Sequence, residues 1–313
     1  MKKQGILKNA SPSLQFFLLL LLIVIGLIVG TAFSIVTVWT INGGQISMGQ
    51  TLSSLSGSLK NLVVAQIISQ LFTFLLPPLC FSYLISGSLF GYFLGEDKKN
   101  PKKYFVGFAI ILLAGFFLQL LIIDKESFIF PDWLKGLEIS SMRTQATYDS
   151  FVKQLIGIKG AFNFSVVFVM IAILPAIGEE LLFRGVIQKS IAALTKTEWP
   201  AIIISGVLFG LMHLEFFNFF ALCFMGFVLG TLYSFTKNIW LTIFLHFMNN
   251  AISFITLYFY QNGTSKFDPE QKLPLYIPLI AGVAMLILFY MLHKKKFEIT
   301  KGETIIENTE TTF

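Results

Sequence analysis

Long apolar segments are the feature of this 313-residue sequence that most restricts its fold. A helix needs about 20 consecutive apolar residues to cross the hydrocarbon core of a bilayer. Candidate segments follow one another over 14–41, 62–84, 104–123, 161–182, 201–214, 217–235, 239–259 and 273–292. They predict an all-α, polytopic integral membrane protein with about eight transmembrane helices.

The composition supports this prediction. Hydrophobic residues make up 55% of the chain and charged residues only 13%, against roughly 45–50% and about 25% in ordinary globular proteins. Even a soluble domain of about 300 residues buries only about 75% of its unfolded surface, so a soluble enzyme is excluded. The first segment is also too long for a cleaved signal peptide, whose apolar part spans about 7–15 residues.

The net charge of +6 comes from short clusters of lysine and arginine between the apolar segments. With eight alternating spans and the N-terminus inside, most clusters fall on the cytoplasmic side, including Lys2, Lys3, 98–103 and 294–296. We therefore expect both termini in the cytoplasm. The compact lysine-rich loops fit a bacterial plasma membrane. The lipid bilayer is the expected partner, and no polar basic domain is present for a nucleic acid.

Two regions depart from simple spans. The long connection 125–160 contains Phe128, Phe130 and Trp133, so we expect it to lie along the outer membrane surface as an extracytoplasmic interfacial loop. Pro77 and Pro78 fall inside the second span, and we expect them to kink or break it.

Ionisable residues inside a span are costly and by default indicate function. They gather in the second half of the chain, and the first cluster is Glu179, Glu180 and Arg184. Glu180 and Arg184 are four residues apart and can pair on one helix face. Glu179 is turned about 100° away. We therefore expect one neutralised carboxylate and one free carboxylate.

The second cluster contains Phe209 and His213, and the third contains His246 and Asn250, which share a helix face. A single membrane histidine is usually a packed residue, but two histidines, a free glutamate and an asparagine on three spans favour a site. Glu179 lies about five residues from the inner end of its segment, and His246 about seven from Ile239. At 1.5 Å per residue, both are expected about 10 Å below the cytoplasmic face.

Two hydrolytic mechanisms fit these groups. In the first, Glu179 is the general base for a water held by His213, while His246 and Asn250 donate hydrogen bonds to the oxyanion. In the second, Glu179, His213 and His246 bind zinc and leave a position open for water. The first requires no cofactor. The sequence lacks the His-Glu-x-x-His pattern of zincins.

These motifs also carry a family resemblance. The chain resembles the CPBP family of intramembrane proteases, which includes the type II CAAX prenyl endopeptidases and the bacteriocin-processing Abi proteins. It carries, in order on successive spans, Glu179-Glu180-x-x-x-Arg184, Phe209-x-x-x-His213 and His246-x-x-x-Asn250.

The resemblance implies an endopeptidase that acts on membrane-associated peptides or protein tails, with a cavity open to the cytoplasm. It makes Glu179, His213, His246 and Asn250 catalytic and Glu180, Arg184 and Phe209 supporting. We divide the chain into three N-terminal helices (1–124), the interfacial loop (125–160), the protease core (161–260), the last helix (261–292) and a polar cytoplasmic tail (293–313).

Two other functions use the same fold. One is a non-catalytic bacteriocin-immunity or scaffold protein, but the intact set of four polar residues argues against it. The other is a transporter with a proton or ion path, but the early spans lack the paired charges and repeats common in transporters.

Overall fold

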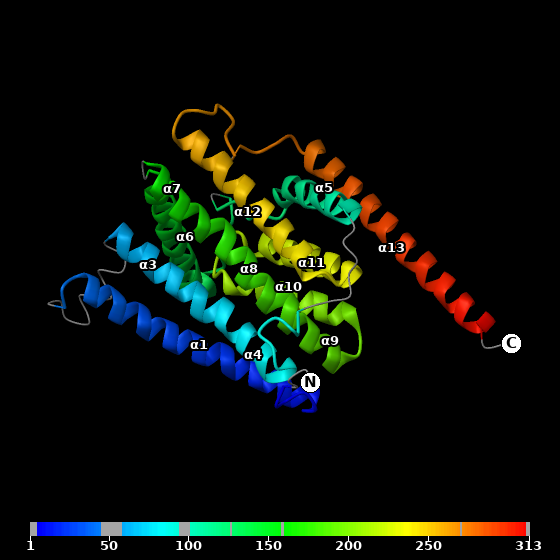
Figure 1. The fold of residues 1–313 in the computed structure, drawn as a ribbon. Coiled ribbons are helices and arrows are strands. Elements are labelled where there is room, and N and C mark those ends of the chain that lie inside the picture. The colour runs from blue at the N-terminus through cyan, green and yellow to red at the C-terminus, as the bar shows by residue number, and fades with distance from the viewer. Residues whose placement is uncertain are drawn as a thin grey trace.

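The computed structural model describes residues 5–44, 58–93, 101–125, 127–157, 160–269 and 271–310, without the side chains of 161–163 and 295–310. These ranges contain helices and no strands (Figure 1). The helices are α1 (Pro12–Ile41), α3 (Leu59–Gln70), α4 (Leu76–Ser86), α5 (Pro101–Leu118), α6 (Lys135–Ile156), α7 (Ala161–Phe168), α8 (Leu174–Glu180), α9 (Lys189–Thr195), α10 (Glu198–Met212), α11 (Phe219–Thr236), α12 (Ile239–Gln261) and α13 (Tyr276–Glu310).

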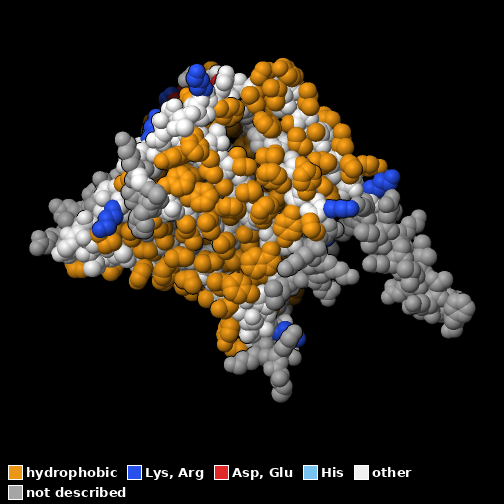
Figure 2. All heavy atoms as spheres, turned by 45° about the horizontal axis from the view of Figure 1, so that its top comes forward, with side chains coloured by type: hydrophobic (Ala, Val, Ile, Leu, Met, Phe, Trp, Pro, Cys, Tyr) orange, Lys and Arg blue, Asp and Glu red, His pale blue; other side chains and the backbone are white. Residues whose placement is uncertain are grey.

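The predicted fold class is confirmed. Seven helical stretches in the described ranges are long and apolar enough to cross a membrane. The remaining predicted span, 201–214, forms α10, whose 15 residues extend about 22 Å at 1.5 Å per residue. Figure 2 shows a broad apolar face with lysine and arginine near its margins. Phe17, Ile28 and Ile280 are each more than 60% exposed, as expected of side chains that contact lipid.

Wide helical turns accommodate the prolines. The second span stays helical over Leu59–Ser86, and a π-helical turn at Leu71–Leu75 precedes Pro77 and Pro78. A second π-helical turn, Val169–Ile173, precedes Pro175 in the same way. Proline has no N–H to donate, and the wider turn lets the helix continue past it. The prolines therefore do not break the span.

The fourth helical stretch is longer than the predicted span. Helix continues over Phe164–Thr195, 32 residues, through α7, α8, a π-helical segment at Leu181–Gln188 and α9. Glu179 consequently lies near the middle of this span. Arg184 and Gln188 are buried and do not end this helix. His246, which lies 3.9 Å from Glu179, is seven residues from the start of α12 at Ile239, as predicted, so the depth of about 10 Å stays a prediction.

Helices α10 and α11 form a tightly packed hairpin. A Cβ atom built on Gly226 would lie 2.9 Å from the Cα of Gly206 and 3.1 Å from the Cβ of Phe209. Only glycine allows the two backbones to approach this closely. The hairpin therefore holds Phe209, and the residues that follow it, close to α11.

The long connection and the tail also have structure. Residues Lys135–Ile156 of the predicted loop form α6, and α13 continues helically through most of the predicted tail. The placement of both termini in the cytoplasm and the domain boundaries stay predictions. Lys2, Lys3, Lys98 and Lys99, on which the orientation rests, lie outside the described ranges.

Candidate active site

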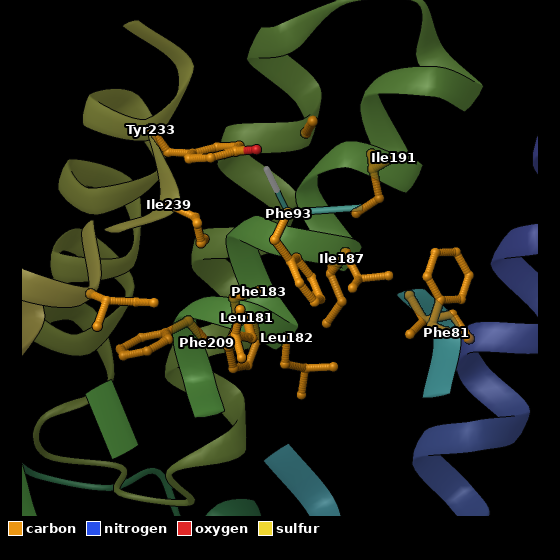
Figure 3. Close-up of a cluster of buried hydrophobic side chains, with 14 of the residues drawn as sticks. Phe81, Phe93, Leu181, Leu182, Phe183, Ile187, Ile191, Phe209, Tyr233 and Ile239 are labelled. Atoms are coloured by element: carbon orange, nitrogen blue, oxygen red, sulfur yellow. The ribbon is translucent and has the colours of Figure 1, made fainter. Parts of the chain in front are cut away.

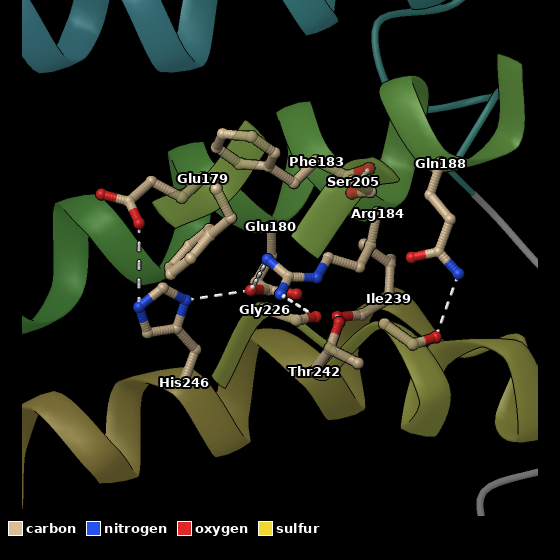
Figure 4. Close-up of polar contacts among 12 residues, drawn as sticks. Glu179, Glu180, Phe183, Arg184, Gln188, Ser205, Gly226, Ile239, Thr242 and His246 are labelled. Carbon is tan, nitrogen blue, oxygen red and sulfur yellow. Dashed lines mark hydrogen bonds and ion pairs between the residues drawn. The ribbon is translucent and has the colours of Figure 1, made fainter. Parts of the chain in front are cut away.

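A buried ion pair lies at the centre of the site. The Nη1 of Arg184 donates to the Oε1 of Glu180 at 2.8 Å, and both side chains are fully buried (Figure 4). This confirms the pairing predicted from their four-residue spacing. An ion pair in a low-dielectric interior needs further hydrogen bonds to offset its desolvation.

Helix α11 supplies one of these hydrogen bonds. The Nη2 of Arg184 donates to the carbonyl of Gly226 at 2.9 Å, and the guanidinium lies 4.9 Å from the centre of the Phe209 ring. One turn further on, the Nε2 of Gln188 donates to the carbonyl of Gly230 at 3.0 Å. Two side chains four residues apart thus bind two carbonyls four residues apart. Sequence reasoning missed these two hydrogen bonds, because the four-residue spacing within each helix does not show which side chains meet which carbonyls.

His246 on α12 lies between the two carboxylates. Its Nδ1–H donates to the Oε1 of Glu180 at 2.9 Å, and its Nε2 lies 3.9 Å from the Oε2 of Glu179. The bond to Glu180 fixes the orientation of the ring and turns Nε2 toward Glu179 (Figure 4). The structure therefore brings Glu179, Glu180, Arg184 and His246 together.

Glu179 has no comparable partner. It is 8% exposed, and its buried Oε2 lacks a hydrogen bond within the described part of the chain. A buried carboxylate oxygen without a hydrogen-bond donor is costly and needs an explanation. The predicted division into one neutralised and one free carboxylate agrees with this geometry.

Phe209 joins His213 to this group indirectly. Its ring centre lies 4.8 Å from that of His213 and 5.8 Å from that of His246. The Nδ1–H of His213 donates to the carbonyl of Phe209 at 2.8 Å, so its Nε2 carries the lone pair in the neutral ring. In this conformation His213 is bonded to its own helix rather than to Glu179.

Asn250 lies one turn beyond His246 and contacts the fourth span. Its Nδ2 donates to the carbonyl of Ile171 at 3.4 Å. Ile171 precedes Pro175 by four residues, and Pro175 has no N–H for that carbonyl. Sequence reasoning placed Asn250 at an oxyanion, whereas here one of its two N–H groups binds a carbonyl that a proline leaves unpaired.

Apolar side chains enclose the ion pair. Leu181, Leu182, Phe183 and Phe209 are each at most 2% exposed and belong to one buried cluster (Figure 3). Their packing excludes water from Arg184 and strengthens its attraction to Glu180.

The residues do not fit the zinc alternative in this conformation. Among the described residues, no group of three His, Cys, Asp or Glu side chains is placed to hold one metal ion. His213 uses its Nδ1 for the bond to Phe209, and no contact brings it to Glu179. Zinc sites require three protein ligands and an open position.

The fold and the site define a polytopic helical membrane protein with a buried chain of carboxylate, imidazole and guanidinium contacts near the middle of a span. Residues 161–252 match the family model for type II CAAX prenyl endopeptidase Rce1-like proteins. This confirms the family resemblance over the segment that carries the whole site.

A curated relative supports the same resemblance. The protein named "Putative membrane peptidase YdiL" of Bacillus subtilis (strain 168) is 30% identical over 161 residues, which are 50% of this chain and 59% of that protein. The chain thus covers less than two thirds of this relative. No solved structure matches the chain at a significant level.

Proposed function

We propose that this chain is an intramembrane endopeptidase that hydrolyses membrane-associated peptides or protein tails. The observation that carries the proposal is Glu179, a buried carboxylate with an unbonded oxygen 3.9 Å from His246. A free carboxylate inside a membrane span is expensive and marks function. The resemblance to CAAX endopeptidases supports peptide hydrolysis as that function.

The charges of the site suggest how His246 acts. Glu180 and Arg184 neutralise each other, which leaves Glu179 with a formal charge of −1. Glu180 occupies the Nδ1 of His246, so Nε2 is the nitrogen that can present an N–H to the substrate. In our proposal this N–H binds the oxyanion that develops on the scissile carbonyl.

The reaction then needs one proton carrier. Glu179 takes a proton from water as the hydroxide oxygen attacks the carbonyl carbon, and returns it to the amine nitrogen as the C–N bond breaks. His213 orients the water through its Nε2 lone pair. The second N–H of Asn250, beyond the one bonded to Ile171, is placed on the same helix face as His246 and can join it at the oxyanion.

The question of a metal cofactor concerns the same residues. We propose the metal-independent glutamate mechanism, because the described residues form no three-ligand group. Zinc held by Glu179, His213 and His246 would require His213 to leave Phe209. The cell context that we propose is a bacterial plasma membrane with both termini cytoplasmic.

The substrate is best found by comparing peptides from cells that carry the wild-type protein or the Glu179→Gln variant at equal expression. We expect peptides cut near a membrane anchor to disappear in the variant. Identical peptide sets would contradict the proposed function.

A further inference from the structure

The segment before α6 packs onto the loop that carries His213. This loop, residues 213–218, joins α10 to α11. The backbone N–H of Ile123 donates to the carbonyl of Phe217 at 2.8 Å. Around this bond lies a group of four phenyl rings, Phe128, Phe130, Phe216 and Phe217, which we call the aromatic clasp.

The rings of the aromatic clasp contact one another across the two segments. Phe130 lies 4.9 Å from Phe216 and 6.5 Å from Phe217, and Phe128 lies 5.6 Å from Phe216, between ring centres. Phe130 is 6% exposed and Phe217 is 3% exposed. Aromatic pairs at these distances stabilise a contact beyond the area they bury. The clasp therefore fixes the loop to residues outside the matched segment 161–252.

The backbone beside His213 needs such support. Leu214 has a φ of 56°, a left-handed conformation that is disfavoured for residues with a Cβ. Its side chain is 79% exposed, so burial of Leu214 itself does not stabilise the turn. A disfavoured backbone persists when the surrounding structure over-determines it. Further restraints near this turn are the bond from the Leu214 N–H to the carbonyl of Leu211 at 3.1 Å and the bond from Asn218 Nδ2 to Glu215 Oε2 at 2.7 Å.

His213 is the residue between a rigid helix and this clasped turn. On one side, its Nδ1–H bonds to Phe209 in α10. On the other side, the chain reverses at Leu214 and reaches Phe216 two residues later. If the clasp opens, Leu214 can relax, and the end of α10 is then free to unwind at His213.

We propose that Phe128 and Phe130 are positioning residues that set the orientation of the His213 imidazole through the loop 213–218. This inference rests on the proposed function for its catalytic meaning. Its structural part, the link from the clasp to His213, is testable without cleavage.

The experiment compares Phe130→Leu with Phe254→Leu as a matched control. Phe254 is 5% exposed and also packs in a phenyl cluster, with Phe164 and Phe168. Both variants lose a buried ring, but only one lies in the aromatic clasp. The readouts are thermal unfolding and nitrogen NMR of the imidazoles in nanodiscs. The protein has three histidines, so single substitutions assign every signal.

We expect both variants to lower Tm by a similar amount and only Phe130→Leu to shift the His213 signals. Unchanged His213 signals in Phe130→Leu would overturn the inference. If Phe130→Leu does not fold, Phe128→Leu replaces it, because Phe128 is 40% exposed and its substitution should destabilise the protein less. A shift of the His213 signals in Phe128→Leu would then support the inference, and unchanged His213 signals would overturn it.

A cleavage assay, with a peptide from the Glu179→Gln comparison, separates this inference from the proposed function. We expect Phe130→Leu to lower kcat about tenfold with little change in KM, since His213 acts on water rather than on the peptide. A raised KM with unchanged kcat would contradict the positioning role. An absence of any Glu179-dependent product would contradict only the proposed function, because the NMR comparison would still decide the link to His213.

Discussion

Glu179 and Glu180 are neighbours in the chain, yet they face opposite nitrogens of one imidazole ring. The Oε1 of Glu180 accepts from Nδ1 of His246 at 2.9 Å, and the Oε2 of Glu179 lies 3.9 Å from Nε2. Consecutive helical residues point about 100° apart, so a ring packed between them can meet both. One carboxylate orients the ring, and the other remains available for chemistry.

The first prediction concerns Glu179. Replacement by glutamine keeps the shape of the side chain but removes its basicity, so cleavage should fall by about 10²–10⁴-fold. Because Glu179 makes no hydrogen bond through Oε2, Tm should change little. Product formation and thermal unfolding measure the two effects. Cleavage at the wild-type rate would disprove the assignment of the base.

The second prediction concerns Glu180. Its replacement by alanine leaves the fully buried Arg184 unpaired, which should destabilise the protein by about 3–5 kcal/mol. Activity should also fall, because His246 loses the partner of its Nδ1–H.

A matched control for Glu180 exists at the protein surface. Glu198 pairs with Lys237, and both side chains are about half exposed. Glu198→Ala also removes the hydrogen bond that Ser234 donates to Glu198 at 2.6 Å, so it should cost about 1–2 kcal/mol, less than Glu180→Ala. Thermal unfolding of both variants in the same detergent compares them. An equal decrease in Tm for the two variants would show that burial of the Glu180–Arg184 pair does not increase its effect on stability.

The third prediction concerns the hairpin of α10 and α11. Gly226→Ala adds a Cβ atom that meets Gly206 at 2.9 Å, so overpacking should destabilise the protein by about 1–3 kcal/mol. Gly115 in α5 has no atom within 4 Å of such a Cβ, and Gly115→Ala should stabilise its helix by roughly 0.5–1 kcal/mol. Opposite shifts of Tm are expected, and a stabilised Gly226→Ala would contradict the close packing.

The fourth prediction concerns metal ions. The proposed mechanism uses protein groups alone, so cleavage should survive exhaustive chelation and reconstitution in metal-free buffer. Loss of activity that returns on addition of zinc, but not of magnesium, would instead support a zinc site formed by a rearranged His213. A chelator pre-loaded with zinc controls for direct effects of the chelator.

The fifth prediction concerns Tyr148 on α6. Tyr148 is 45% exposed; partial desolvation of its phenol, then the negative charges of Glu215 and Asp149, raise its pKa above the ordinary value of 10.0. The folded protein therefore holds the proton more tightly than the unfolded chain. The contribution of Tyr148 to the free energy of unfolding should be fully present below about pH 10 and should decline as the pH rises toward the pKa of the folded protein.

An absorbance titration of phenolate formation tests this electrostatic interaction. The difference between the wild-type protein and Tyr148→Phe isolates the signal of Tyr148. Its midpoint should lie above pH 10, and Glu215→Gln should lower it because one negative charge is removed. A midpoint unaffected by Glu215→Gln would show that α6 does not approach the loop 213–218.

The sequence predicted most of the helices because lipid imposes a simple requirement on apolar length. It also predicted the pair of Glu180 and Arg184, since four-residue spacing defines one helix face. It ended the fourth apolar segment at residue 182, whereas the helix continues to Thr195, because hydropathy counts Arg184 as a charge in lipid. Its guanidinium is in fact neutralised by Glu180 and bonded to Gly226.

The sequence pattern could not predict contacts between segments that lie far apart in the chain. No local pattern indicates that Gly226 accepts from Arg184 or that Asn250 binds Ile171, because helix packing decides which carbonyls meet which side chains. The π-helical turns before Pro77 and Pro175 were not predicted either. The helical form of 135–156 was missed because its composition is mixed rather than apolar.

The short helix α10 has a consequence for the surrounding lipid. Its length of about 22 Å is roughly 8 Å less than the hydrocarbon thickness of a typical bilayer. Ile203, Val207 and Leu211 are at least 40% exposed along it, so we expect lipid to cover this face of the helix. A hydrophobic surface that is too short draws headgroups inward and thins the membrane locally. The bilayer beside α10 is therefore expected to dip toward His213, which shortens the distance that a water molecule must travel through hydrocarbon before it can be consumed in hydrolysis.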